Sequence, residues 1–444
     1  MDSLLNKLSE RNPDSPLLMD ADGTSLAGEC LQDAYALREG PLSGLKGRSV
    51  TLCCIDTVAY IKLLLALDGW AHRILLVDDS LEDTALESFE GSLGIGWRVC
   101  ATAGLPEASE VIGKGQESVH ETESSEWIIP TSGTTGTPKL ITHDFNSLTR
   151  SLKPPNEKSA NLRWGLIYSP TRFAGIQVLL QAWLGGSAII AAKNPVDVET
   201  AIPLLAQHGC NALSATPSLW RKLAFSGILD ALDLEIVTLG GEAADQKILD
   251  TLRKHYTNAT IRHIYASTEA GVGFSVGDGI TGFPSSFLET PPAGIEMKLG
   301  DDGMLMLRPL NPAQGLSPTS ESWLDDDGWI RSGDLVERRG DRCYFLGRES
   351  GAINVGGQKV HPGHVEEILL EVPGVAAARV YGKPNPVLGA LVAADLIAED
   401  PCGQDELRKQ LATHCKQRLE RHQTPALINF VETFNLSPAG KIER

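Results

Sequence analysis

The chain has 444 residues, of which 42% are hydrophobic and 22% are charged, and its 57 Asp and Glu outnumber its 39 Lys and Arg to give a formal net charge of -18. This length exceeds one ordinary hydrophobic core and predicts two or three domains. An acidic chain without a run of Lys and Arg repels phosphate backbones, so we expect no nucleic-acid partner.

Membrane and secretory signals are also lacking in the sequence. The most apolar stretch, residues 176–192, is interrupted by Gln, Gly and Ser and is shorter than the roughly 20 residues of a membrane span. Residues 1–15 have neither a basic region nor a long apolar run, so we expect no signal peptide. Eight scattered cysteines without Cys-x-x-Cys spacing argue against a zinc site and predict buried thiols in the cytoplasm.

Taken in chain order, short apolar runs alternate with helical patterns from residue 49 to residue 265. The predicted strands are 49–55, 74–77, 126–130, 187–190, 211–215, 235–239 and 261–265, and the clearest predicted helices are 59–67 and 244–256. Such alternation predicts an α/β fold in which mostly parallel sheets are covered by helices. Residues 101–125 and 278–324 are rich in Gly, Ser, Glu or Pro and are predicted to be loops or linkers.

The pattern changes near Gly347. The sequence beyond it predicts helices at 364–371 and 405–421 and strands at 376–382, 390–396 and 428–434. We therefore expect a large N-terminal region of several subdomains, residues 1–346, and a small α+β C-terminal domain, residues 347–444.

The sharpest local motif is TSGTTGTPK, residues 131–139, directly after a predicted strand. Gly133 and Gly136 permit close approach of the backbone, and hydroxyls and Lys139 surround exposed amides, as a polyphosphate requires. The motif is not a Walker loop, because Pro138 and Leu140 replace its second Gly and its magnesium-binding Ser or Thr. The alternative is a flexible surface linker.

Four further motifs are weak when each is taken alone. YASTE, residues 265–269, combines a ring, hydroxyls and a carboxylate after a strand, which would suit a nucleotide base and a hard cation. LGGE, residues 239–242, also follows a strand. DGWIRSGD, residues 327–334, equally suits a hairpin turn, and the Gly-Lys pair at 440–441 equally suits a frayed tail.

Together and in this order, the five motifs resemble those of the adenylate-forming superfamily, which holds acyl- and aryl-CoA synthetases, adenylation domains of non-ribosomal peptide synthetases, and luciferases. The resemblance spans residues 127–444, with Ala266 in place of a usual Gly and Ser332 in place of a usual Thr. Residues 347–367 resemble the hinge and the start of the C-terminal domain. The resemblance implies a mobile C-terminal domain that rotates between two poses.

The resemblance also implies a role for each motif. The loop at 131–139 would hold the β and γ phosphates, Tyr265 would stack on adenine, and Thr268 would contact the α-phosphate. Asp334 would accept the ribose hydroxyls with help from Arg348. The implied catalytic residues are Lys139, Thr268, Glu269 as the Mg²⁺ ligand, and Lys441, which would bridge the carboxylate and the α-phosphate. The implied ATP-binding residues are Thr131, Ser132, Gly133, Thr134, Thr135, Gly136, Lys139, Gly240, Gly241, Glu242, Tyr265, Ala266, Ser267, Thr268, Asp334 and Arg348.

For the second pose, the resemblance implies a thiol tunnel beside Gly356 and Gly357, which have no side chain to obstruct it. Ser350 occupies the hinge position that is usually Asp or Lys. The implied acyl pocket consists of Arg172, Phe173, Ala174, Gly175, Thr216 and Gly241, with Trp220 nearby. Amino-acid-activating members carry Asp where this chain has Ala174, and the His-Asn of aryl-acid carrier ligases is missing. An α-amino acid is therefore disfavoured, and Arg172 is either a partner for a second polar group of the substrate or an outward surface residue.

The function that the resemblance implies is ATP-dependent activation of a carboxylic acid as acyl-AMP, with release of pyrophosphate, and transfer to a thiol. ATP and Mg²⁺ are the expected cofactors, and CoA is the preferred acceptor. The alternatives are an enzyme that loads the phosphopantetheine arm of an acyl carrier protein, acyl transfer to an amine, and a non-catalytic nucleotide-binding protein.

Overall fold

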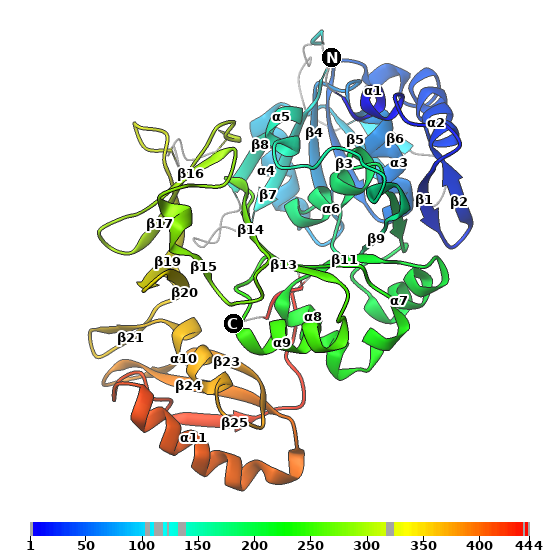
Figure 1. Cartoon of the computed structure of the whole chain (residues 1–444). Helices are drawn as coiled ribbons and strands as arrows, with labels where there is room; N and C mark the ends of the chain where they lie inside the picture. Colours follow the sequence, from blue (N-terminus) through cyan, green and yellow to red (C-terminus); the bar gives the residue numbers. More distant parts are fainter. Residues whose placement is uncertain are drawn as a thin grey trace.

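The computed structural model describes residues 3–102, 107–110, 119–121, 124–131, 139–316, 324–437 and 440–442, with only the backbone for 107–110, 314–316 and 401. Two large sheets with their helices form the N-terminal region, a third sheet lies beside them, and the C-terminal domain lies below (Figure 1). This arrangement is the α/β architecture that the sequence predicts.

The first large sheet has eight strands and carries most of the candidate site. Its order is β14-β13-β12-β11-β9-β10-β1-β2, and all five pairings from β13 to β1 are parallel. Hairpin partners close both edges antiparallel. The strands are β1 (Pro16–Asp20), β2 (Gly23–Leu26), β9 (Arg163–Leu166), β10 (Ala188–Ala191), β11 (Ala212–Ala215), β12 (Ile236–Gly240), β13 (Thr260–Ser267) and β14 (Gly271–Val276).

The second large sheet has seven strands in the order β18-β8-β7-β4-β3-β5-β6. Its central pairings are parallel, and β8, β18 and β6 add antiparallel edges. The strands are β3 (Ser49–Cys54), β4 (Arg73–Asp78), β5 (Trp97–Ala101), β6 (Glu107–Glu110), β7 (Glu126–Thr131), β8 (Lys139–His143) and β18 (Gln314–Leu316).

Helices join the two large sheets into one core. A single buried cluster includes Leu52 of β3, Leu64 of α3, Leu179 of α6 and Leu166 of β9, so apolar side chains fill the space between the sheets. The helices of this region are α1 (Leu4–Leu8), α2 (Ala27–Glu39), α3 (Thr57–Leu67), α4 (Asp83–Leu93), α5 (Phe145–Thr149), α6 (Phe173–Leu184), α7 (Val198–Gln207), α8 (Pro217–Phe225) and α9 (Gln246–His255). The short 3₁₀ turns are η1 (Ser43–Leu45), η2 (Ser159–Asn161), η3 (Ile228–Ala231), η4 (Ser285–Leu288), η5 (Glu349–Gly351) and η6 (Pro401–Gly403).

A third, wholly antiparallel sheet shows that the prediction of a loop over 278–324 is wrong. Its order is β15-β20-β19-β17-β16, and the stretch contributes β15 (Phe283–Pro284), β16 (Ile295–Leu299) and β17 (Met304–Pro309). Ile295 and Met297 are buried while Lys298 is exposed, so the stretch folds as an alternating strand despite its many Gly and Pro. The sheet is completed by β19 (Ile330–Arg339) and β20 (Arg342–Arg348).

The C-terminal domain has the predicted α+β composition. It contains β21 (Ile353–Val355), β22 (Gln358–Val360), α10 (Pro362–Leu370), β23 (Val375–Asn385), β24 (Gly389–Ala398), α11 (Gln404–Arg418) and β25 (Leu427–Phe430), with its own buried cluster. The predicted boundary after residue 346 falls inside β20, and Ser350 lies in η5. The mobility of this domain stays a prediction.

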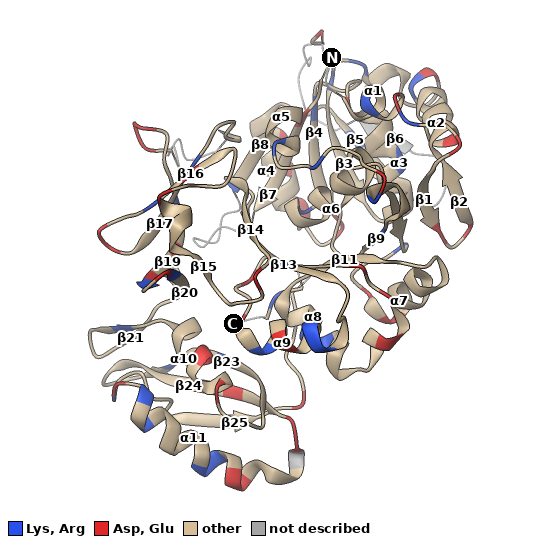
Figure 2. Cartoon of the chain, viewed as in Figure 1, with Lys and Arg blue, Asp and Glu red and all other residues tan. Residues whose placement is uncertain are grey.

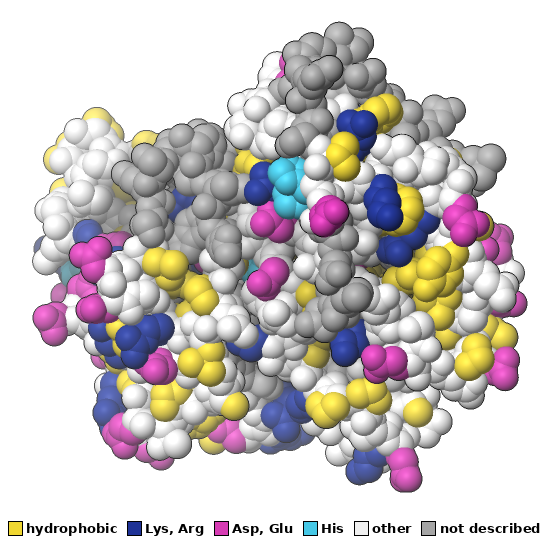
Figure 3. Space-filling view, turned by 90° about the horizontal axis from the view of Figure 1, so that it is seen from above, with side chains coloured by type: hydrophobic (Ala, Val, Ile, Leu, Met, Phe, Trp, Pro, Cys, Tyr) yellow, Lys and Arg dark blue, Asp and Glu magenta, His cyan; other side chains and the backbone are white. Residues whose placement is uncertain are grey.

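The surface carries both acidic and basic side chains, as the composition indicates (Figure 3). Acidic and basic side chains are interspersed on the face seen in Figure 3. Within the described ranges, the structure contains no helix that is long and apolar enough to cross a membrane.

Six cysteines are buried, but Cys100 is partly exposed and Cys402 is exposed, so the expectation of burial is wrong for Cys402.

Candidate active site

Three predicted motifs meet at the carboxyl ends of neighbouring strands in the eight-stranded sheet. Gly241 follows β12, Thr268 and Glu269 follow β13, and Thr216 is the N-cap of α8 directly after β11. The Oγ1 of Thr216 accepts a hydrogen bond from the Leu219 backbone at 3.1 Å, which fixes the start of α8. Parallel strands end at a common edge, so this topology gathers residues from distant parts of the chain.

The C-terminal segment brings Lys441 to this edge (Figure 1). The Thr216 hydroxyl donates to the carbonyl oxygen of Gly440, and the backbone N–H of Ile442 donates to Oε1 of Glu242 at 3.2 Å. Gly241 has φ +81°, and a Cβ built there would lie 3.3 Å from Cε and 3.9 Å from Nζ of Lys441. The lysine therefore lies over a backbone position that only glycine leaves open.

The ammonium of Lys441 lies in a field of carboxylates. Loss of solvent lowers its pKa, whereas Glu242, Asp334 and Glu269 raise it. The nearby guanidinium of Arg348 lowers it further. The balance leaves the pKa of Lys441 below its ordinary value, and the neighbouring carboxylates favour its charged form.

Asp334 is held by two partners from different strands. Its Oδ1 is 2.8 Å from Nε of Arg348, and its Oδ2 accepts a hydrogen bond of 2.7 Å from the Tyr265 hydroxyl. Burial raises the pKa of Asp334, and Arg348 and Tyr265 oppose that shift. The carboxylate is thereby oriented at the junction of the first and third sheets, where it keeps lone pairs for further donors.

The ring of Tyr265 belongs to an aromatic cluster. It stacks on Phe274 and on Phe345, each with ring centroids 5.2 Å apart. Its hydroxyl is committed to Asp334. Its predicted contact with adenine therefore has to use the part of the ring that the two phenylalanines leave free, and it stays a prediction.

The remaining residues of the YASTE motif differ in their partners. Ala266 packs against the main core, and the Ser267 hydroxyl accepts a hydrogen bond from the Ala270 backbone at 3.0 Å. Glu269 is partly buried, and among the described residues no group forms a hydrogen bond or ion pair with its carboxylate. Its electrostatic influence reaches both Asp334 and Lys441.

His143 is a residue of the site that the sequence analysis missed. It is 1% exposed at the end of β8, its Nε2 donates to the carbonyl oxygen of Thr268 at 2.8 Å, and its Nδ1 is 3.1 Å from Oγ of Ser147. Its ring also stacks on Phe173 at 5.5 Å. Burial lowers its pKa to about 4, so the ring is neutral and can both donate and accept. Through these contacts His143 connects β8, the strand after the predicted phosphate loop, with Thr268 and with Phe173 at the start of α6.

The structure places only the ends of the predicted phosphate loop. Thr131 and Lys139 are register partners across β7 and β8, and the Thr131 hydroxyl donates to the Lys139 carbonyl oxygen at 3.3 Å. The predictions for the loop residues concern positions outside the described ranges, namely Ser132, Gly133, Thr134, Thr135 and Gly136.

The predicted acyl pocket is only partly assembled. Arg172, at the start of α6, pairs with Asp78 at 3.3 Å beside a cavity of about 140 Å³ between β4, β7 and α6. Phe173 is buried, Ala174 packs on the core, and a Cβ at Gly175 would lie 2.1 Å from the Ser169 carbonyl oxygen, so Gly175 lets the first turn of α6 pack closely on the preceding backbone.

Trp220 is a core residue rather than a pocket residue. It has 0% exposure, and its indole N–H donates to the carbonyl oxygen of Thr238 at 2.9 Å. Its suggested place in the pocket is therefore wrong.

The two tunnel glycines lie in the turn between β21 and β22, with φ +60° at Gly356 and +91° at Gly357. A Cβ at Gly356 would lie 3.1 Å from Leu388, whereas one at Gly357 would meet open space. The contact with Leu388 is internal to the C-terminal domain, and the tunnel role of the two glycines stays a prediction for the second pose.

The chain that carries this site can be assigned to a known protein family. The profile described as AMP-binding enzyme matches residues 65–313, more than half of the chain, and the profile described as AMP-binding enzyme C-terminal domain matches residues 364–441. The chain belongs to the AMP-binding enzyme family. The superfamily resemblance of its motifs is thereby confirmed.

Similar proteins of this family differ in the acceptor that their names give. The acyl-coenzyme A synthetase ACSM1 of Homo sapiens is 26% identical over 350 residues, which are 71% of this chain but 59% of that protein. The fatty acid–[acyl-carrier-protein] ligase MmaC of Mycobacterium marinum is 26% identical over 71% of this chain and 66% of its own length. The chain thus spans about three fifths of the first of these relatives.

A solved structure supports the fold over the whole chain. The o-succinylbenzoate CoA synthetase of Bacillus subtilis, solved with its acyl-adenylate intermediate, has a TM-score of 0.75 and 18% identity, and the match covers 100% of this chain and 97% of that one.

Proposed function

We propose that this AMP-binding enzyme activates a carboxylic acid with ATP as an acyl-adenylate and then transfers the acyl group to a thiol. The observation that carries the proposal is the position of Lys441, which the C-terminal domain brings over Gly241 at the strand edge of Glu242 and Thr268, where the charge of Asp334 from the third sheet also acts on it.

The chemistry explains the value of that cation. In adenylation the substrate carboxylate oxygen forms a bond to the α-phosphorus of ATP, the bond to the β-phosphate oxygen breaks, and pyrophosphate leaves with the electron pair. Two anions must approach, so a positive charge between them lowers the barrier. A unit charge at about 4 Å in an effective dielectric near 20 contributes roughly 4 kcal/mol, or about a thousandfold in rate.

Mg²⁺ fits the donor set that the structure leaves available. The carboxylate of Glu269 is partly buried beside Thr268, and carboxylate oxygens are preferred magnesium ligands. Glu269 would hold the ion, and Mg²⁺ would supply neutralisation of phosphate charge. Asp334 and Arg348 would orient the ribose, because their mutual ion pair already fixes the carboxylate.

The acceptor is proposed to be CoA, and the phosphopantetheine arm of a carrier protein is the alternative. Both acceptors occur in the names of similar proteins. The substrate is proposed to be other than an α-amino acid, because Ala174 provides no carboxylate for an ammonium group. Arg172 would reach a second polar group of the acid only by sharing or leaving Asp78.

A panel of aliphatic and aromatic carboxylic acids in an ATP–pyrophosphate exchange assay tests the first half-reaction. We expect exchange with at least one acid and none with α-amino acids. Addition of CoA or of a holo carrier protein then identifies the acceptor by the thioester formed. Absence of exchange with every acid class would contradict the proposed function.

A further inference from the structure

Lys247 connects the N-terminal region to the C-terminal domain. Its Nζ lies 2.5 Å from Oε1 of Glu399 and donates to the carbonyl oxygen of Val375, also at 2.5 Å. Val375 and Glu399 lie together at one end of the β23–β24 hairpin, where Val375 pairs with Ala398. One ammonium therefore binds two groups of the same rigid hairpin.

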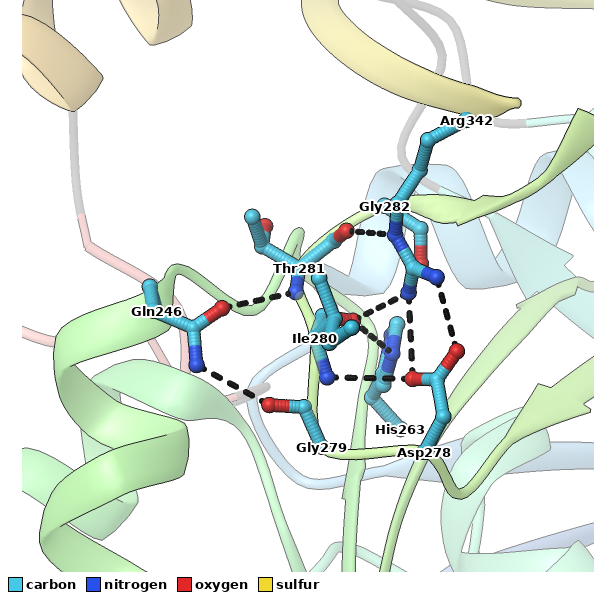
Figure 4. Close-up of polar contacts among 8 residues, drawn as sticks. All are labelled: Gln246, His263, Asp278, Gly279, Ile280, Thr281, Gly282 and Arg342. Carbon is cyan, nitrogen blue, oxygen red and sulfur yellow. Dashed lines mark hydrogen bonds and ion pairs between the residues drawn. The ribbon is translucent and has the colours of Figure 1, made fainter. Parts of the chain in front are cut away.

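The backbone of Lys247 is firmly placed by its own region. The neighbouring Gln246 accepts a hydrogen bond from Thr281 at 3.1 Å and donates to Gly279 at 2.9 Å (Figure 4). Arg342 holds the loop of residues 278–282 through both oxygens of Asp278 and through three carbonyl oxygens (Figure 4). Arg342 is 8% exposed. This loop and the buried face of α9 fix the backbone from which the Lys247 side chain reaches the C-terminal domain.

Two further cations of the N-terminal region lie near carboxylates of the C-terminal domain. Arg339 of β19 is 3.7 Å from Glu367 of α10. Arg221 of α8 is paired with Asp245 and also interacts electrostatically with Glu366. Figure 2 shows basic segments of α8 and α9 above acidic segments of the C-terminal domain. At these three contacts the cation belongs to the N-terminal region and the carboxylate to the C-terminal domain.

We infer that Lys247, through Glu399 and the Val375 carbonyl, is a latch that holds the C-terminal domain in the pose that presents Lys441 to the strand edge. Lys247 is thus a positioning residue for adenylation. The inference rests on the proposed function for the reaction, whereas the pose itself can be measured without any substrate.

Rigid-body geometry explains why the latch selects a pose. Glu399, Val375 and Lys441 all lie beyond η5, so rotation of the domain that withdraws Lys441 also carries Glu399 and Val375 away from Lys247. The Lys247 and Glu399 side chains are 30% and 49% exposed, which makes the ion pair weak enough to open in each cycle. Loss of the ion pair together with the hydrogen bond to Val375 would shift the equilibrium between the two poses by about threefold to tenfold.

The two half-reactions separate a latch from a general structural role. With an acid found in the exchange panel, Lys247→Ala should lower ATP–pyrophosphate exchange by about threefold to tenfold, mainly in kcat. The rate of thioester formation from supplied acyl-adenylate should stay equal or rise. Lys254→Ala is the matched control, because Lys254 is exposed on the same helix. Equal losses in both half-reactions would overturn the inference.

A distance measurement tests the pose without catalysis. Nitroxide labels on the exposed native Cys402 and on Lys222→Cys, in a Cys100→Ala background, report the separation of the two parts by pulsed electron paramagnetic resonance. Lys247→Glu and Glu399→Lys should each reduce the population at the distance seen in the parent protein, and their combination should restore much of it. An unchanged distribution in the single variants, or no recovery in the double variant, would overturn the latch. Failure of the exchange panel alone would instead contradict the proposed function.

Discussion

Asp334 and Lys441 both belong to the candidate site but are held in different ways. Asp334 is fixed by Tyr265 and Arg348, which belong to strands of the N-terminal region, and His143 fixes the backbone of Thr268 nearby. Lys441 depends on a short segment that touches that region through Gly440 and Ile442. The geometry around Asp334 does not depend on Lys441, so we propose that the Asp334 side is a platform for the nucleotide and that Lys441 is a cation that the C-terminal domain can withdraw.

The largest expected effect is on the adenylation rate when Lys441 is replaced. Lys441→Ala should lower adenylation by about a thousandfold, because the charge between carboxylate and phosphate is lost. Thioester formation from supplied acyl-adenylate should largely survive, since that step uses the other pose. Lys416→Ala, at an exposed site of the same domain, is the control. If a folded Lys441→Ala variant lost both half-reactions equally, Lys441 would not be a cation that serves adenylation alone.

The platform should respond to acid through His143. Its pKa in the folded state is about 4, below the ordinary value of 6.5, so the stability that it contributes is complete above pH 6.5 and declines as the pH falls toward 4. The full difference is worth roughly 3 kcal/mol in the free energy of unfolding. Urea unfolding between pH 4 and pH 8 should show this decline in the parent protein and a flatter profile in His143→Gln. Parallel profiles would contradict the assignment.

Asp334→Asn tests whether the platform binds the ribose. Loss of the charge should weaken the affinity for ATP by about tenfold to a hundredfold, because hydrogen bonds to charged groups are worth roughly 1.5–3 kcal/mol. Isothermal titration with Mg·ATP measures the change. Asp302→Asn is a suitable control, since Asp302 is exposed and pairs with Arg331 elsewhere on the third sheet. Unchanged ATP affinity would exclude the ribose role.

The smallest expected effect concerns the surface on which Lys441 rests. Gly241→Ala places a Cβ against Lys441 and should slow adenylation by about fivefold, with ATP affinity nearly unchanged. Gly340→Ala introduces the same backbone strain at φ +65° with no atom within 4 Å, so it should lower stability alone. Equal rates for the two variants would show that contact with Lys441 does not matter there.

Much of the fold was predictable because its signals are local. The apolar run of β3 and the 3.6-residue pattern of α9 each identify one element without reference to the rest of the chain. The third sheet was missed because composition was given more weight than alternation over 295–299, where Ile, Met and Leu alternate with Glu and Lys. The family was predictable because five motifs occur in order.

Site residues were harder to predict where their role depends on partners that are far away in the sequence. His143 has no local signal, because its importance comes from a carbonyl group 125 residues away. Lys247 likewise resembles any exposed lysine on an amphipathic helix until the C-terminal domain is placed against it. For Arg172 the sequence predicts either contact with a second polar group of the substrate or a surface position, and its ion pair with Asp78 is a third arrangement that the sequence alone does not indicate.

The carboxylate of Glu242 accepts hydrogen bonds from two backbone amides, one in its own region and one in the C-terminal segment. Its Oε2 accepts from Ser218 within the N-terminal region at 3.1 Å, whereas its Oε1 accepts from Ile442, 200 residues away, at 3.2 Å. The Ile442 amide is therefore protected from solvent exchange only while the C-terminal segment is docked. The hydrogen–deuterium exchange rate of the Ile442 amide, relative to that of the Ser218 amide, therefore reports how often the C-terminal segment leaves its docked position.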